Sequence, residues 1–216
     1  MAWSVFCITL TMKVNLIFLL FLFTLFASAQ KDTSRQLEAA GIKSVYINTD
    51  EVFKILIKTT NSDQISISTH SEGEYFNDIT LNSEAKGNSL YLSTQFPEIL
   101  QSGYDKLSAH KVFSLEVILE IPENLQVFIR SNIAAVEAEG SYNFIEAQLK
   151  SGYCSLFNFT GNALINTYNG AISIQTTDAT LTASSRNGEV IVPLAFSGKH
   201  LIKATSINGA IRVVKN

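Results

Sequence analysis

Side chains that could perform acid–base or metal chemistry are few in this sequence, and they share no common spacing. The carboxylates of the second half fall at different positions of a repeat that is described below: Glu137, Glu139, Glu146, Asp178 and Glu189. The histidines, His70, His110 and His200, lack the short separations typical of metal ligands. Catalysis, such as the cleavage of a glycan, needs converging acid, base or metal groups. We therefore predict no catalytic residue, no metal site and no cofactor.

Three cations, in contrast, occur at one position of that repeat. Arg130, Lys150 and Arg186 each come directly before a turn residue. If their side chains lie in one outward stripe, they would form a groove for an acidic glycan or an acidic protein segment. The alternative is an ordinary solvated face, neutralised by Glu137 or Glu146.

Two tyrosines have outward positions in the same register. Tyr153 and Tyr168 could contribute to a sugar site, because aromatic rings offer apolar area with a polar end. Tyrosine is also an ordinary strand residue.

The repeat that would position these side chains has five copies. Their turn residues lie 20, 18, 18 and 21 residues apart: Ser131, Ser151, Asn169, Asn187 and Asn208. Apolar or small residues alternate on both sides of each turn, as in strands with one buried face. Asn-Gly at the last three turns predicts a positive φ at the glycine.

Aligning the copies on their turns places like residues in columns. The column three residues after the turn contains Ala134, Cys154, Ile172, Val190 and Ile211. All of these are apolar or small, so we predict that Cys154 is a buried structural thiol and not a reactive one.

Two architectures are compatible with this pattern. Asn-Gly between alternating strands is typical of β-hairpins, which would give an antiparallel meander. A near-constant period with recurring columns instead favours a β-solenoid, whose coils stack at about 4.8 Å with like residues above like. We predict the solenoid.

The first half of the mature chain supplies further strands. Alternating patterns occupy residues 44–48, 53–58, 64–69, 89–93 and 113–122. We predict an all-β protein with an N-terminal β region at 30–122, which acts as a cap and continues without a linker into repeats at 123–216.

Residues 1–29 have the pattern of a secretory signal peptide. Lys13 precedes an 11-residue apolar run at 16–26, and the small residues Ala27, Ser28 and Ala29 follow. The run is shorter than the roughly 17 residues that cross a bilayer, which argues against a retained anchor helix. We predict that translation starts at Met12, that the leader is cleaved and that no membrane anchor remains.

Composition excludes several classes of protein. The chain is 46% hydrophobic and 16% charged with a formal net charge of −3, and loss of Lys13 with the leader leaves 15 basic and 19 acidic residues, a net charge of −4. No basic tract is present, so nucleic acid is not a predicted partner. Cys7 lies in the leader, so Cys154 cannot be part of a disulfide framework.

The sequence has a long strand candidate that ends in Ile121-Pro122, followed by units such as residues 168–174 (YNGAISI) and 207–213 (INGAIRV). This arrangement resembles the bacterial putative-adhesin domain family, which is related to the head GIN domain. The resemblance covers residues 43–216. It implies a right-handed β-solenoid-like envelope protein and brings no catalytic residues. The chain differs from surface-displayed proteins by lacking a cell-wall sorting motif, a lipid-attachment cysteine and a further C-terminal secretion module.

We therefore expect a non-enzymatic exported protein of the periplasm, the outer surface or the medium, acting as an adhesin or interaction scaffold. The alternatives are a periplasmic structural or sensory partner of an envelope-stress signalling system and, third, a glycan-active solenoid enzyme. Partners would be an envelope or surface protein or an acidic glycan. Self-association through the terminal strand, Ala210 to Lys215, is also predicted, because Arg212 and Lys215 are its only charged residues and charges disfavour pairing at an edge.

Overall fold

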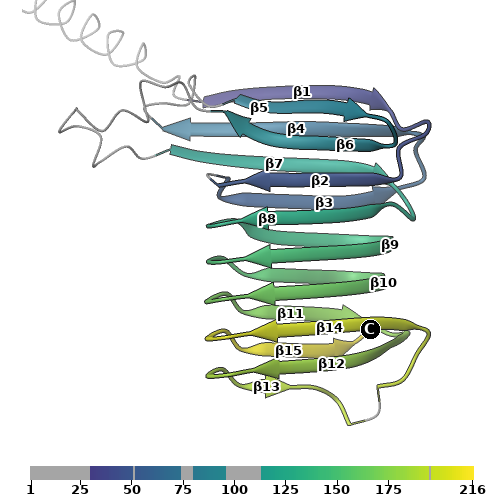
Figure 1. The fold of residues 1–216 in the computed structure, drawn as a ribbon, viewed down its shortest axis with the longest axis vertical. Helices are drawn as coiled ribbons and strands as arrows, with labels where there is room; N and C mark the ends of the chain where they lie inside the picture. The colour runs from purple at the N-terminus through teal and green to yellow at the C-terminus, as the bar shows by residue number, and fades with distance from the viewer. Residues whose placement is uncertain (1–29, 51, 74–79, 96–112, 195) are drawn as a thin grey trace, which may run out of the picture. The chain divides into compact units, whose positions relative to one another are not determined.

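The structure is a computed structural model that describes residues 30–50, 52–73, 80–95, 113–194 and 196–216 (Figure 1). Lys31–Asn216 forms one compact unit, and the predicted boundary at residues 122 and 123 falls inside it. The leader at 1–29 and His110 lie outside the described residues, so the signal peptide stays a prediction. In the described ranges no helix has the length and apolarity needed to cross a bilayer.

The described part of this unit is built from strands, which confirms the all-β prediction. Fifteen strands join in one open, mixed sheet. They are β1 (Gln30–Glu38), β2 (Ser44–Thr49), β3 (Lys54–Thr60), β4 (Gln64–Gly73), β5 (Thr80–Lys86), β6 (Ser89–Gln95), β7 (Phe113–Pro122), β8 (Gln126–Ser131), β9 (Ala135–Leu149), β10 (Cys154–Thr167), β11 (Ile172–Thr176), β12 (Ala179–Ser185), β13 (Val190–Ile191), β14 (His200–Ser206) and β15 (Ile211–Lys215).

The strands pair in two rows that share β9 and β10 (Figure 1). Row A has the order β5–β6–β2–β8–β9–β10–β14–β12, and row B has the order β1–β4–β7–β3–β9–β10–β11–β15–β13. The β4–β7 and β5–β6 ladders are antiparallel. The ladders from β6 and β7 onward to β12 and β13 are parallel.

The parallel ladders follow from the path of the chain, which alternates between the rows. From β6 onward, as also with β2 and β3, a strand in row A is followed by a strand in row B, and this second strand is the crossover that parallel neighbours require. Inward side chains of both rows pack into a single core. Its members include Val45 and Ile47 from row A and Ile55 and Ile57 from row B.

β9 and β10 run through both rows because each bends at residues with unusual backbone conformations. Gly140 in β9 has φ 109°, and Asn158 and Gly161 in β10 have φ 44° and 142°. The β9–β10 register shifts between Phe157 and Asn162. A Cβ at Gly161 would lie 2.2 Å from the Tyr142 carbonyl oxygen, so the bend also needs a residue without a side chain.

The predicted columns are correct for four of the five copies. Cys154 pairs with Ile172, and Ile211 pairs with both Ile172 and Val190. The first copy was aligned two residues out of register, since Cys154 pairs with Val136 and not with Ala134. A shift of two residues keeps every side chain on the same face, so the apolar pattern cannot detect it.

The spatial order of the last copies differs from their order in sequence. β14 lies between β10 and β12, and β15 lies between β11 and β13. The terminal strand is therefore not the edge that we predicted. The edges at this end are β12 in row A and β13 in row B, and self-association itself stays a prediction.

The glycines of the turns do not serve the purpose that we predicted. Gly152 has φ 88°, but Gly170, Gly188 and Gly209 have no positive φ. They stack instead: a Cβ at Gly170 would lie 1.5 Å from the Gly152 carbonyl oxygen, and one at Gly209 would lie 1.9 Å from that of Gly170. Close approach of neighbouring turns, and not dihedral strain, requires glycine at these positions.

Candidate functional site

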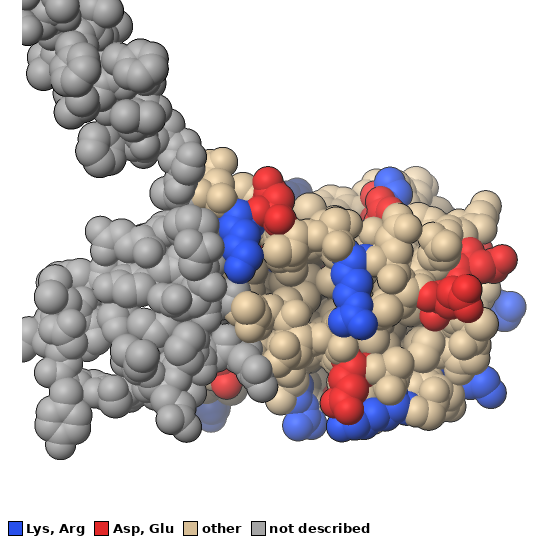
Figure 2. Space-filling model, turned by 90° about the horizontal axis from the view of Figure 1, so that it is seen from above, with Lys and Arg blue, Asp and Glu red and all other residues tan. Residues whose placement is uncertain are grey.

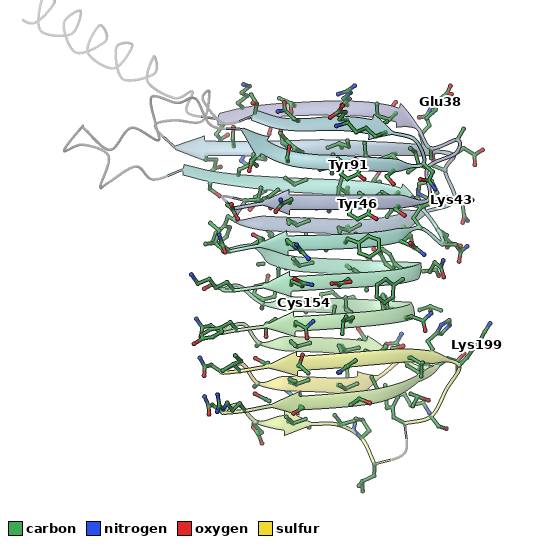
Figure 3. All side chains as sticks on the ribbon, viewed as in Figure 1. Glu38, Lys43, Tyr46, Tyr91, Cys154 and Lys199 are labelled. Atoms are coloured by element: carbon green, nitrogen blue, oxygen red, sulfur yellow. The ribbon has the colours of Figure 1, made fainter. Side chains whose placement is uncertain are left out.

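Three aromatic side chains form a ladder on the outer face of row A. Tyr91, Tyr46 and Phe128 occupy paired positions of the neighbouring strands β6, β2 and β8. The Tyr46 ring lies 5.0 Å from that of Tyr91 and 4.8 Å from that of Phe128, with 10° between the planes in each case (Figure 3). Phe144 extends this aromatic ladder at an angle, 5.9 Å from Phe128.

A groove of about 390 Å³ runs along the aromatic ladder, and we name it the aromatic groove. The rings contribute to it together with Asn48 and Arg130, which pair across β2 and β8 two residues further along the same strands. Glu146, the β9 partner of Phe128, also lines it. The aromatic groove thus combines apolar ring surface with an amide, a cation and a carboxylate.

A second groove of about 630 Å³ shares Asn48 and Arg130 with the first, so the two are continuous. This polar groove is also lined by Asp50, Asn132, Gln148, Lys150, Asn166 and Tyr168. Asn132 donates a hydrogen bond of 2.9 Å to the Asp50 carboxylate. Amides and charged groups of both signs therefore line a shallow surface across several strands.

The three predicted cations do not lie in one stripe. Arg130 pairs with Gln148, whereas Lys150 follows β9 and donates its backbone N–H to Ser131. Arg130 and Lys150 both line the polar groove, but Arg186 lies beyond β12 and does not line it. The binding role of the three residues stays a prediction.

Neither predicted counter-charge pairs with the groove cations. Glu137 lies in row B, where it accepts a hydrogen bond from Tyr153 and forms an ion pair of 3.2 Å with Lys54. The Tyr153 hydroxyl and the Lys54 ammonium hold the pKa of Glu137 below its ordinary value. Glu146 accepts a hydrogen bond from the Gln148 amide.

The groove cations have no ionic partner in the described ranges. None of the ion pairs found there involves Arg130 or Lys150. Both side chains are exposed. An anionic ligand in the polar groove would therefore displace water and not an existing carboxylate.

The aromatic ladder was not predicted, although the sequence contains a signal for it. The segments 44–47 (SVYI), 89–92 (SLYL) and 126–129 (QVFI) share the order polar, aliphatic, aromatic, aliphatic. Aligning these three segments places their aromatic residues in one column. The two outward tyrosines that we named are exposed as predicted, but only Tyr168 lines a groove of row A.

Cys154 is buried, as predicted. Its side chain is fully inaccessible between Val136 and Ile172, and burial raises the pKa of the thiol to about 12. It therefore remains a neutral core residue at physiological pH.

His70 is held between two carboxylates. Its ring nitrogens bind Asp32 on β1 and Glu72 on β4, at 2.5 and 2.8 Å. The hydrogen bonds to these two carboxylates raise the pKa of His70 to about 9. His70 thus links β1 to β4, and no cluster of metal ligands occurs among the residues that the structure describes.

Because the folded pKa of His70 lies above its unfolded value, the link is complete below about pH 6.5 and is lost as the pH rises through 9. We expect an NMR titration of the His70 ring to show a midpoint near pH 9, and the Asp32→Asn variant to lower it. A wild-type midpoint near 6.5 would show that the ring is not bound to these carboxylates.

Comparison with known proteins supports the fold. No protein-family model and no curated protein matches the chain. The structure is similar to that of a putative cell adhesion protein from Clostridium sporogenes, with a TM-score of 0.62, 17% identity, and coverage of 87% of this chain and 100% of that one.

A weaker similarity is to a putative adhesin from Bacteroides fragilis, with a TM-score of 0.38, 12% identity, and coverage of 86% of this chain and 97% of that one. The link to the head GIN domain stays a prediction. At the level of fold, this chain is similar to the Clostridium sporogenes protein.

Proposed function

We propose that this protein is an exported, non-enzymatic cell-envelope protein that acts as an adhesin or interaction scaffold. The observation that carries the proposal is the continuous pair of grooves on the outer face of row A. A regular face that presents rings, amides and unpaired cations suits recognition by many weak contacts.

We further propose that the paired rows are the coils of a right-handed β-solenoid. The parallel registers and the stacked turn glycines support this description. The right-handed sense rests on the strong general preference of parallel crossovers for that hand. Coils stacked in this way extend the binding face strand by strand.

The ligand that fits the grooves best is an acidic glycan. Arg130 and Lys150 lie one strand apart and about two residues out of register, which separates their Cα atoms by about 8 Å. Two carboxylates along a polysaccharide can meet such a pair of cations. Asn48 and Gln148 can bind hydroxyl groups between them, while the aromatic ladder packs against apolar sugar faces.

Two observations support a role without catalysis. Both ring nitrogens of His70 bind carboxylates, and Cys154 is buried, so neither provides a base or a nucleophile. The two carboxylates that line the grooves also have hydrogen-bond partners, since Glu146 accepts from Gln148 and Asp50 accepts from Asn132. Release of reducing ends from a polyuronate by the protein would favour the glycan-active enzyme instead.

Binding to immobilised polygalacturonate, alginate and hyaluronan tests the ligand class, with dextran as the uncharged control. We expect Arg130→Glu with Lys150→Glu to weaken binding about tenfold or more, because two attractive contacts become repulsive. Arg186→Glu reverses one cation outside the grooves, half the change of charge of the double variant, and should weaken binding less than about twofold. Equal losses in both variants, or no binding to any polyuronate, would refute an acidic ligand in the grooves.

Protease treatment of intact and lysed cells that carry a tagged copy tests the location. Digestion on intact cells is the result expected for an adhesin. Protection until lysis would place the protein in the periplasm and favour the envelope-stress partner.

A further inference from the structure

The end of row A formed by β12 is an open strand edge. Among the described strands β12 pairs only with β14, so no described strand pairs with the outer side of Ala179–Ser185. Its sequence, ATLTASS, contains no charge and no proline, although natural edges are commonly protected by one of these. The neighbouring edge of row B is only the two residues of β13, and Pro193 follows it.

The core is also incompletely covered at this end. Leu181 and Ala183 point inward but are only half-buried, whereas the equivalent Ile202 and Ala204 of β14 are fully buried. One further strand beside β12 would bury Leu181 and Ala183 to the same degree.

The opposite end of the unit is charged. Arg35 of β1 donates a hydrogen bond of 2.6 Å to the Ser83 hydroxyl of β5, which bridges the outer strands of the two rows. Glu84 and Lys86 of β5 form an ion pair of 2.8 Å. Figure 2, which looks onto this end, shows acidic and basic side chains among uncharged ones. This end therefore does not complement the uncharged β12 edge.

β12 is, however, complementary to itself. In an antiparallel pair centred on Thr182, Thr182 faces Thr182 of the second copy, Thr180 faces Ser184, and Leu181 faces Ala183. Outward threonine and serine pair with each other, and the inward apolar residues extend the core. A two-fold axis at Thr182 gives each residue of the strand a matching partner at once, since a two-fold interface brings identical patches together.

We propose that two copies of this protein associate through their β12 strands, antiparallel and centred on Thr182, to form a closed dimer with one continuous row A. The charged side chains of β1 and β5 disfavour a further contact at the other end, so the assembly stops at two copies. The dimer presents two sets of grooves and would bind a polyvalent surface more tightly than one copy. The proposal does not depend on the ligand of those grooves.

Disulfide trapping tests the register. The Cys7→Ser change leaves Cys154 as the one native cysteine, and Cys154 is buried and unreactive. An introduced thiol is therefore the accessible one. We expect Thr182→Cys to form a covalent dimer under mild oxidation, because facing Cβ atoms in an antiparallel pair lie about 5 Å apart.

Lys203→Cys is the matched control. Lys203 is exposed and pairs with Thr182 on the adjacent strand β14, which places it about 14 Å from its equivalent in the dimer. This variant should stay monomeric on a denaturing gel. Equal cross-linking in both variants would indicate random collision and refute the β12 interface.

Sedimentation velocity of the wild type and of Thr182→Lys gives an independent test. We expect a wild-type dimer at micromolar concentration and a folded monomer for Thr182→Lys, since two ammonium groups would face each other across the axis. Unchanged circular dichroism of the variant establishes that it is folded. A wild-type monomer at high concentration, or a dimer that survives the lysine, would overturn the proposal.

Discussion

Replacing Phe159 by alanine is expected to lower the free energy of unfolding by about 4 kcal/mol. Phe159 is among the largest fully buried side chains, and its ring stacks on that of Tyr142 at 5.6 Å. The Tyr142 hydroxyl in turn donates to the Ile57 carbonyl oxygen in β3. Removing the Phe159 ring would leave a cavity where β10 bends between the rows, and the fixed Tyr142 cannot move to fill it.

Phe157→Ala is the matched control for this change. It removes the same side chain from the same strand, two residues away, but Phe157 is 42% exposed. We expect a loss below about 1 kcal/mol. Urea denaturation of both variants measures the difference, and similar losses would mean that Phe159 does not lie in the core.

Replacing Gly170 by alanine is expected to cost about 3 kcal/mol, although it adds only one methyl group. The new Cβ would lie 1.5 Å from the Gly152 carbonyl oxygen and 3.2 Å from the Tyr153 Cα, both backbone atoms that cannot rotate away. The Asn169 turn would have to move away from its neighbour. The backbone hydrogen bond from Asn169 to the Lys150 carbonyl oxygen would then weaken.

Gly87→Ala separates this steric effect from the general cost of losing a glycine. Gly87 has φ 60° and no atom within 4 Å of an added Cβ, so only backbone strain of about 1 kcal/mol is expected. Thermal unfolding of both variants provides the comparison. If Gly87→Ala were the more damaging change, dihedral strain and not close approach would explain the turn glycines.

Much of the fold could be predicted from local pattern. Alternation at Val45 and Ile47 and at Ile172 and Ile174 identified strands with one buried face, because the side-chain period of a strand is two. The near-constant spacing of the turns indicated neighbouring strands with like residues in columns, which is correct for the last four copies. The buried state of Cys154 followed from its column.

The aromatic ladder shows why the candidate site could only partly be predicted. Tyr46 and Tyr91 are 45 residues apart in the chain, and they meet because β2 pairs with β6. Arg130 and Lys150 were found from the repeat, but the place of Arg130 beside Asn48 depended on the register between β8 and β2, and that of Lys150 on the register between β9 and β8.

The sequence by itself determined the all-β class, most of the strands and the faces that they bury, since these depend on hydrophobic alternation within a few residues. The mostly polar strands β1 and β5 lack that pattern and were not predicted. Only the tertiary structure decided the two-residue register of the first copy, the position of β14 and β15 inside the stack, and therefore which strand is the open edge. Every alternative order of these strands buries nearly the same apolar residues. Long-range packing and close backbone approaches, such as that of Gly170 to Gly152, select one of them.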